Sequence, residues 1–311
     1  MKRGRKNCLA DSGSAEGAPI VSVSRSAEHR RRLIAVAMIA VLGLSAGFLG
    51  LRRTTDSPVR RFGVGVSTVA IESRAVGRRL RVTVVVPPGA RTARPRALLV
   101  FLHGRGANNT SFLVTEMFQA LAGLGRHAPI VAFPDGGDHS YWHDRREGAW
   151  GRYVTDEVIP GVGHRFGADT HRAAIGGISM GGFGALELGR LHPGRFCAVG
   201  AHSPALWASA GDTAPGAFDD AADFARHNLL ADVGATLSPF RGVPVWLDAG
   251  DADPFRRGDT VLASALRAAG AKLTERMWPG GHEGEYWNRH WASYLGFYAA
   301  ALRDCRPAAT R

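Results

Sequence analysis

Ser179 lies at the centre of a Gly-x-Ser-x-Gly run formed by residues 177–181. This pattern is typical of a sharp strand-to-helix turn that exposes a serine nucleophile. Side chains at positions 177 and 181 would collide with the neighbouring strand and helix, which favours glycine there. Because the chain contains 40 glycines in 311 residues, the pattern alone carries little weight and its flanks must support it.

The flanks of Ser179 support this interpretation. Residues 172–178 form a short apolar segment that predicts a buried strand, and residues 182–191 form a small-residue and leucine-rich segment that predicts a helix. A strand, a serine and a helix in this order direct the free N–H groups of the helix start to the place where an oxyanion would form. Ser179 is therefore a candidate nucleophile.

To act as a nucleophile, a serine hydroxyl needs a base that takes its proton and an acidic residue that orients this base. Residues 243–249 predict a buried strand, and an acidic turn follows it. Residues 272–278 predict a further strand, which ends in a Pro-Gly-Gly turn immediately before His282. The order Ser, Asp, His along the chain is that of the α/β-hydrolase fold. The alternative for His282 is an ordinary histidine of a surface loop.

Two aspartates compete for the acid position. Asp253 lies three residues after Gly250 and directly before Pro254, whereas Asp251 follows that glycine at once and can point along the turn. We favour Asp253. The alternative for both carboxylates is simple turn chemistry, since Gly-Asp and Asp-Pro are common in loops.

The oxyanion needs two N–H donors, and we expect them from the backbone of Met180 and Arg105. Arg105 follows an apolar strand predicted at residues 97–102, in the run Leu-His-Gly-Arg-Gly. The alternative for this run is an ordinary glycine-containing turn between a strand and a helix.

Residues 62–304 resemble the esterase D-type branch of the α/β hydrolases, which includes feruloyl and acetyl-xylan esterases, S-formylglutathione hydrolases and secreted mycolyltransferases. The most specific match is Ser-Met-Gly-Gly-Phe-Gly-Ala-Leu at residues 179–186. The resemblance implies an α/β-hydrolase fold, triad roles for Ser179, Asp253 and His282, and substrate contacts for four residues: His103, Tyr141, Trp142 and Trp287. The acid loop at residues 248–253 departs from the fuller loop of the formylglutathione enzymes, and an aspartate in place of the mycolyltransferases' glutamate favours the esterases.

The remaining pattern predicts a mostly parallel sheet flanked by helices. Residues 62–71 and 80–86 predict an antiparallel edge, and residues 130–133 with 150–166 and then 196–201 continue the alternation of strands and helices. Residues 203–241 interrupt this alternation and are either a small cap-like insertion, with 218–228 as its ordered part, or a solvated connection.

The N-terminal region predicts a membrane segment. Residues 33–51 contain no charge and are long enough to cross a bilayer, with three arginines before them and two after. This charge pattern predicts a cytoplasmic basic arm at 1–32, a linker at 52–61 and a catalytic domain at 62–306 outside the membrane. Two alternatives stay open: an uncleaved signal anchor, which we favour, and a signal peptide that uses twin arginines.

Composition excludes several partners and cofactors. Residues 1–61 hold 12 basic against 4 acidic residues, and residues 62–311 hold 27 against 23, so most of the net charge of +12 lies outside the domain. The domain also lacks a basic stripe interleaved with aromatics, so we expect no nucleic acid. His139 and His143 beside Asp144 could bind a metal on a helix, but the preceding Pro-Asp-Gly-Gly predicts a loop, and we expect neither a metal nor another cofactor.

The three cysteines leave one pairing open. Cys8 lies in the arm, while a disulfide between Cys197 and Cys305 is permitted outside the cytoplasm but not indicated by their spacing. The oligomeric state is not indicated either.

These patterns together predict a serine-dependent hydrolase of carboxylic esters, with a small-molecule or cell-envelope ester as its substrate. An acyltransferase that passes the acyl group to a sugar or glyceride hydroxyl would use the same residues. A third possibility is an envelope-binding protein that has kept the fold without catalysis.

Overall fold

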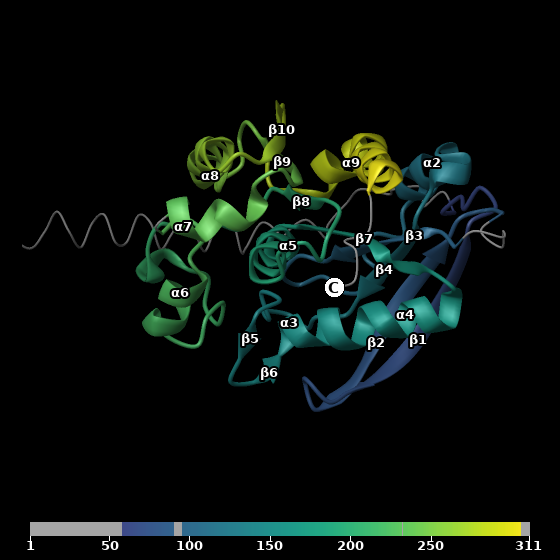
Figure 1. Cartoon of the computed structure of the whole chain (residues 1–311), viewed down its shortest axis with the longest axis horizontal. Coiled ribbons are helices and arrows are strands. Elements are labelled where there is room, and N and C mark those ends of the chain that lie inside the picture. The colour runs from purple at the N-terminus through teal and green to yellow at the C-terminus, as the bar shows by residue number, and fades with distance from the viewer. Residues whose placement is uncertain (1–57, 90–94, 232, 306–311) are drawn as a thin grey trace, which may run out of the picture. The chain divides into compact units, whose positions relative to one another are not determined.

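A computed structural model describes residues 58–89, 95–231 and 233–305. Its main feature is an eight-stranded sheet with the strand order β1-β2-β4-β3-β7-β8-β9-β10 (Figure 1). The strands are β1 (Gly65–Ser73), β2 (Arg78–Val86), β3 (Ala97–Leu102), β4 (Ile130–Pro134), β7 (Asp169–Ile178), β8 (Val199–His202), β9 (Pro244–Gly250) and β10 (Lys272–Trp278). A separate short hairpin joins β5 (Asp144–Arg145) to β6 (Gly148–Ala149).

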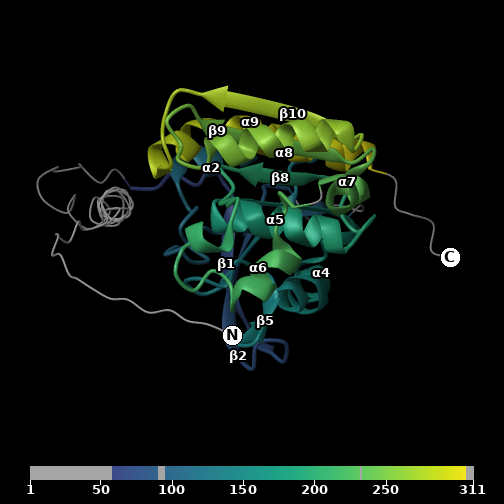
Figure 2. The ribbon, with the colours of Figure 1, turned by 90° about the vertical axis from the view of Figure 1, so that its left-hand side faces the viewer.

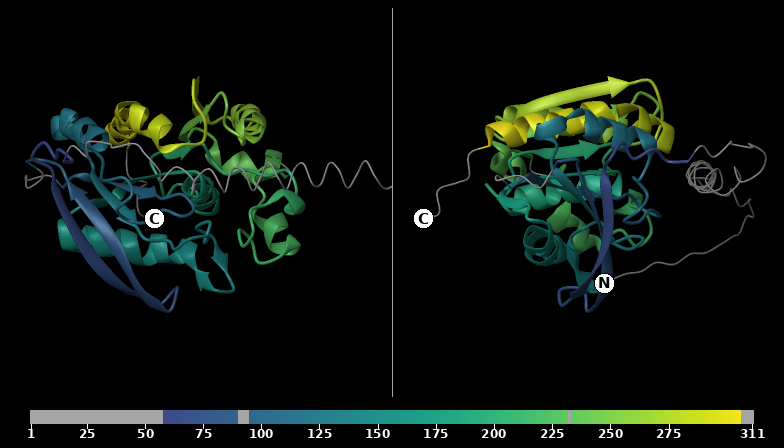
Figure 3. Two further views of the ribbon diagram at one scale, coloured as in Figure 1. Left: turned by 180° about the vertical axis from the view of Figure 1, so that it is seen from behind. Right: turned by 90° about the vertical axis from the view of Figure 1, so that its right-hand side faces the viewer.

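The sheet is parallel except at one edge. β1 pairs antiparallel with β2, and β2 pairs antiparallel with β4, whereas all pairs from β4 to β10 are parallel. β1 and β2 form a long ribbon in Figure 3, and β10 forms the opposite edge of the sheet in Figure 2. Every residue of β3 and β4 is buried, as expected for parallel strands covered on both faces. The predicted fold class and the antiparallel edge are confirmed.

Helices cover both faces of this sheet. On one face α2 (Thr115–Gly123) packs against α9 (Gly284–Asp304), and their buried side chains join one apolar cluster (Figure 1). On the other face α4 (Ile159–Phe166), α5 (Met180–Leu191) and α8 (Arg256–Ala268) contribute to a second cluster. This arrangement leaves the carboxyl ends of the parallel strands free to hold a site.

The helix predicted at residues 150–166 has an irregular middle. It begins as α3 (Trp150–Arg152), widens into a π-helical stretch at Tyr153–Val158 and continues as α4. The N–H of Ile159 accordingly donates to the carbonyl of Val154, five residues back. Because Pro160 follows and has no N–H to donate, a regular α-helical ladder cannot pass this point.

A buried carboxylate ties the strands to α9. Asp248 of β9 accepts hydrogen bonds at Oδ1 from Trp246 Nε1 (2.7 Å) and His202 Nδ1 (2.6 Å), and at Oδ2 from the hydroxyls of Tyr286 and Tyr294 (both 2.9 Å). Four donors satisfy an ionised carboxylate, even in a buried position. The Asp248 network therefore fixes α9 against β8 and β9, directly below the strand ends that carry the candidate site.

Two glycines make room for the next member of this network. The Tyr298 hydroxyl lies 2.9 Å from His202 Nε2, and a Cβ built on either Gly176 or Gly200 would lie 1.8 Å from that hydroxyl oxygen. Only a residue without a side chain leaves space for the tyrosine at these two strand positions.

We expect Gly200→Ala to lower the free energy of unfolding by about 1–3 kcal/mol, because the added methyl overpacks the core. Chemical denaturation measures this loss, and a Tyr298→Phe background should relieve part of it by removing the hydroxyl. Gly123→Ala is the matched control, since a Cβ there meets nothing within 4 Å, and it should change stability by less than about 1 kcal/mol. Equal effects of the two alanines would contradict the packing argument.

The insertion at residues 203–241 is docked on the domain. It contains α6 (Ala221–His227), inside the predicted ordered part, and α7 (Val233–Leu237). α6 lies beside β5 and α5 in Figures 1 and 2. Arg145 of β5 donates to the carbonyl oxygens of Gly216 and Ala217 and contacts the Asp219 carboxylate at 3.1 Å. These bonds attach residues 216–219 of the insertion to β5.

A disulfide joins Cys197, just before β8, to Cys305, just after α9. It closes a loop of 108 residues that includes the insertion and the predicted acid and base. The sequence had left this pairing open.

The predicted arm at residues 1–32, the predicted membrane segment at 33–51 and most of the predicted linker lie outside the described residues. Within residues 58–89, 95–231 and 233–305, no helix combines the length and the apolar character that a membrane crossing requires.

Candidate active site

Ser179 occupies a strained turn between β7 and α5. Its backbone angles are φ 56° and ψ −115°, a region that non-glycine residues rarely adopt. Its N–H donates to the carbonyl of His202 (2.9 Å), and its carbonyl accepts from the N–H groups of Phe183 and Ala205. Neighbouring β8 and the first turn of α5 therefore hold Ser179 in its unusual conformation.

The flanking glycines are required by close approach of the backbone. A Cβ on Gly181 would lie 2.1 Å from the carbonyl oxygen of Leu102, and a Cβ on Gly177 would lie 2.4 Å from the carbonyl oxygen of Gly181. Neither position has a flexible side chain that could move aside, so the turn can form only with glycine at both.

The structure brings the three predicted catalytic residues together. His282 Nε2 lies 2.8 Å from Ser179 Oγ, and His282 Nδ1 lies 2.9 Å from Asp253 Oδ2. The side chain of Asp253 is fully buried, whereas that of His282 is 22% exposed. This continuous chain of hydrogen bonds matches the geometry in which an imidazole takes the proton of a serine and a carboxylate holds the imidazole tautomer.

The structure separates the two competing aspartates. Asp253 Oδ1 accepts from the N–H of Phe255 (2.8 Å), which leaves Oδ2 directed at His282. Asp251 is exposed, and its Oδ1 accepts from the N–H of Gly280 (3.1 Å), two residues before His282. Asp251 thus fixes the loop that carries the histidine, and it does not contact the imidazole.

Aromatic side chains surround the His282 ring. Phe255 and Trp287 meet it edge-on, with ring centroids 5.2 and 5.1 Å away. Trp287 also donates through Nε1 to Ser203 Oγ (3.1 Å). Trp207 of the insertion packs against Phe255 at 5.6 Å and is partly exposed. The sequence predicts a substrate contact at Trp287. It predicts none at Phe255 or Trp207, which only the structure places near His282.

The predicted oxyanion donors lie on the two segments that border the serine. Met180 is the first residue of α5, where a backbone N–H has no carbonyl one turn earlier in the helix. Arg105 lies in the loop after β3, and a Cβ on the preceding Gly104 would lie 3.3 Å from Ser179 Cβ. This short distance shows how closely that loop approaches Ser179.

Two predicted substrate contacts need correction. His103 is 1% exposed, and its Nε2 accepts from the N–H of Gly136 (2.9 Å) while its Nδ1 lies 2.8 Å from the carbonyl oxygen of Gly104. Trp142 is fully buried and donates to the carbonyl of His103 (3.1 Å). Because both side chains are enclosed and their polar atoms are engaged, they support the loop after β3 and do not form the wall of a substrate site.

Tyr141 lies between the loop and the insertion. It is 2% exposed, has a positive φ of 49°, and packs against Phe183 and Trp207. Burial raises the pKa of its hydroxyl to about 12, although the nearby Arg105 guanidinium acts in the opposite direction. Tyr141 therefore stays neutral, and its ring backs the partly exposed Trp207 instead of facing solvent. The substrate contact predicted for Tyr141 is thus a third that needs correction.

Asp259 is a buried carboxyl in the first turn of α8, behind the loop of Asp253. Both of its oxygens are buried without a hydrogen-bond partner among the described residues. Burial, followed by the charges of Asp253, Asp248 and Glu275, raises the pKa of Asp259 to about 9. At neutral pH this group is protonated in the folded protein and ionised in the unfolded chain.

We therefore expect the free energy of unfolding to fall as the pH rises from about 4 to about 9, because the unfolded chain releases the Asp259 proton first. Asp259→Asn should remove this contribution and stabilise the protein at pH 8, by about 1–3 kcal/mol, with less effect at pH 4. Urea denaturation at both pH values measures the difference. The exposed Asp304→Asn should show no such difference, and the same result for Asp259→Asn would refute the assignment.

His139 and His143, the two histidines near Asp144 that could bind a metal, do not come together around that aspartate. Asp144 accepts from the N–H groups of Gly151 and Arg152. His139 lies 3.8 Å from each of two exposed carboxylates, those of Asp138 and Glu147. His143 is directed elsewhere, toward the insertion.

Comparisons with known proteins show the family and the fold of the chain. Residues 73–298 match the family model described as "Putative esterase". An esterase of Mycobacterium tuberculosis is 28% identical over 179 residues, which are 53% of this chain and 37% of that protein. The S-formylglutathione hydrolase of Mus musculus is 28% identical over 149 residues, 40% of this chain and 52% of that protein. The chain thus spans about half or less of these curated relatives.

A solved structure of a ferulic acid esterase has the same fold. It superposes with a TM-score of 0.66 at 23% identity, covering 78% of this chain and 99% of that one.

Proposed function

Because the chain belongs to the "Putative esterase" family, we propose that it hydrolyses carboxylic esters through a serine nucleophile. The observation that carries this proposal is the unbroken chain of hydrogen bonds from Ser179 Oγ through His282 to Asp253. The substrate is a small-molecule ester or an ester of the cell envelope, and the chemistry requires no cofactor.

In the first half of the reaction Ser179 Oγ attacks the ester carbonyl carbon while His282 Nε2 takes the hydroxyl proton. The carbonyl oxygen becomes an oxyanion, which the N–H groups of Met180 and Arg105 stabilise. The bond from carbon to the alkoxy oxygen then breaks, His282 gives its proton to the leaving alcohol, and an acyl-enzyme remains.

In the second half a water molecule attacks the acyl carbon while His282 takes one of its protons. The bond to Ser179 Oγ breaks, the proton returns to that oxygen, and the carboxylic acid leaves. Asp253 stays ionised throughout and stabilises the imidazolium formed in each half.

The test uses p-nitrophenyl esters from acetate to palmitate and a serine-reactive fluorophosphonate. We expect turnover that does not depend on an added alcohol, and stoichiometric labelling of the peptide that contains Ser179. A product that forms only with added glycerol or glucose would instead establish an acyltransferase. A folded protein with neither turnover nor labelling would support the alternative of a binding protein that has kept the fold without catalysis.

We place this reaction outside the cytoplasmic membrane. Two observations support the location: the disulfide between Cys197 and Cys305, which persists in oxidising compartments, and the uncharged run at 33–51 behind three arginines. Protease treatment of intact spheroplasts tests it. Digestion of the catalytic domain is the expected result, and full protection in intact spheroplasts but not in lysed ones would place the domain inside.

A further inference from the structure

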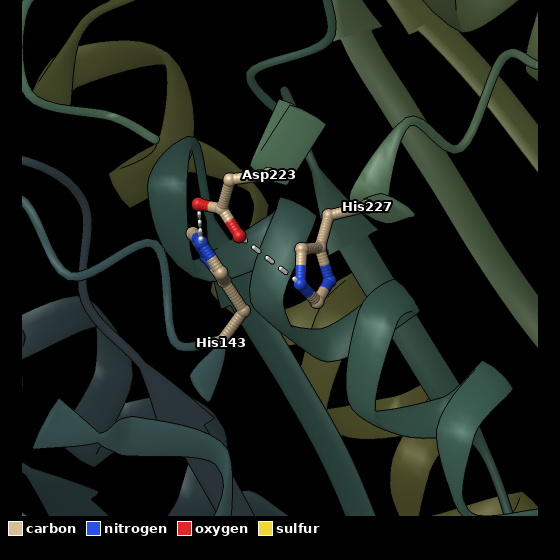
Figure 4. A group of neighbouring side chains, drawn as sticks. All are labelled: His143, Asp223 and His227. Atoms are coloured by element: carbon tan, nitrogen blue, oxygen red, sulfur yellow. Dashed lines mark hydrogen bonds and ion pairs between the residues drawn. The ribbon is translucent and has the colours of Figure 1, made fainter. Parts of the chain in front are cut away.

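Three ionisable side chains meet where the insertion touches the domain. His143 comes from the segment before β5, and Asp223 and His227 come from one face of α6, four residues apart (Figure 4). His143 Nε2 lies 3.1 Å from Asp223 Oδ2, and His227 Nε2 lies 3.5 Å from Asp223 Oδ1. One potential ligand atom from each residue lies within 4.8 Å of the others.

The chemistry of these groups suits a divalent transition metal. Two imidazoles and a carboxylate form the ligand set of many three-residue zinc sites. Four-coordinate zinc with bonds of about 2.0–2.1 Å places its ligand atoms roughly 3.3 Å apart. The two observed separations, 3.1 Å to Asp223 Oδ2 and 3.5 Å to Asp223 Oδ1, are close to this value, with one imidazole at each oxygen of the carboxylate.

The surroundings provide an outer partner for one ligand. Glu187 of α5, whose side chain is fully buried, lies with Oε1 2.6 Å from His227 Nδ1. A metal-bound histidine ordinarily donates its second ring N–H to such a carboxylate, which fixes the tautomer and directs the other nitrogen at the metal. Here that other nitrogen is His227 Nε2, the atom that faces Asp223.

One buried nitrogen of this cluster has no hydrogen-bond partner among the described residues. His143 is fully buried, and its Nδ1 has no partner in the part of the chain that the structure describes. An ion bound at Nε2 would leave Nδ1 as the protonated ring nitrogen, and that buried N–H would need a separate partner such as water.

Two arginines also approach the carboxylates. Arg226 Nη2 lies 2.9 Å from Asp223 Oδ1, and Arg190 Nε lies 2.9 Å from Glu187 Oε2. The Arg226 side chain is 63% exposed, so it can turn into solvent when a cation takes its place at Asp223. Arg190 can stay on Glu187, because that carboxylate would contact His227 and not the metal.

We propose that His143, Asp223 and His227 bind one Zn²⁺ ion, with Glu187 orienting His227. The ion links α6 of the insertion to the segment that also carries Tyr141. Since Tyr141 backs Trp207 beside the candidate active site, the metal would hold the insertion in place next to that site. The sequence indicated no metal because the ligands lie in two segments about 80 residues apart.

The test measures metal binding directly and so does not depend on the proposed esterase activity. The full chain, stripped with a chelator, is titrated with ZnCl₂ by calorimetry and with CoCl₂ by visible absorption. We expect one strong site per chain, the absorption bands of four-coordinate Co²⁺, and loss of those bands when Zn²⁺ is added.

Asp223→Asn and His227→Gln should each weaken Zn²⁺ binding at least about tenfold, while the exposed His171→Gln should bind as the unchanged protein does. Far-UV circular dichroism confirms that each variant is folded. If one of the two ligand variants misfolds, the other still tests the proposal. Absence of stoichiometric binding by the unchanged protein would overturn the proposal. So would equal binding by all three variants, which would place the ion at other histidines.

Discussion

Ser179→Ala should lower kcat for p-nitrophenyl acetate by about 10⁴- to 10⁶-fold, leaving only the catalysis that the oxyanion donors and binding supply. The alanine removes the single atom that would form the acyl-enzyme, and it retains a Cβ, so the strained turn keeps its packing. Labelling by the fluorophosphonate should disappear together with turnover.

A serine outside the site provides the control. Ser264 lies on the exposed side of α8, where its hydroxyl donates to the carbonyl of Thr260 one turn earlier. Ser264→Ala should leave kcat within about twofold of the unchanged protein. A Ser179→Ala variant that keeps its fold and more than about a hundredth of the activity would point to a different nucleophile or to direct attack by water.

The close approach of Ser179, His282 and Asp253 could be predicted from the sequence because each residue follows a strand of the parallel sheet. A buried parallel strand is a short apolar run, and a turn at its carboxyl end is marked by glycine or proline. The order of the three turns along the chain then indicated the fold. The sequence favoured Asp253 over Asp251 from its place in the turn after β9, and in the structure the hydrogen bonds with His282 and Gly280 separate the two residues.

The assignment of His103 and Trp142 to the substrate failed for a packing reason. Glycines create the space that encloses Trp142: a Cβ on Gly136 would lie 2.4 Å from the far edge of its ring, and a Cβ on Gly184 would lie 2.4 Å from its Cβ. A sequence shows an aromatic residue near a predicted loop, but it does not show which distant glycines leave a cavity for the ring.

The contacts of the insertion could not be predicted either. Its sequence is rich in Ala, Asp, Gly and Pro and carries no clear periodicity. Trp207, His143 and Asp223 acquire their neighbours only when the insertion docks against β5 and α5. Such contacts depend on where the insertion lies on the domain, and local sequence patterns contain no information about that position.

Asp253→Asn should reduce kcat about 10⁴-fold at neutral pH without unfolding the protein. The amide has nearly the same shape as the carboxylate, but its NH₂ group would donate toward His282 Nδ1. The imidazole would then carry its proton on Nε2, the atom 2.8 Å from Ser179 Oγ, and could not accept the serine proton. KM should change little, because Asp253 is buried behind the histidine and does not reach a substrate.

Asp251→Asn makes the same chemical change two residues away. Its Oδ1 can still accept from the N–H of Gly280, and the residue is exposed, so kcat should remain within about threefold. Steady-state kinetics of the two variants at one pH separates the acid from the turn residue, and unfolding curves confirm that both are folded. A large loss in Asp251→Asn together with a small one in Asp253→Asn would transfer the acid role to Asp251 and require the loop to rearrange during the reaction.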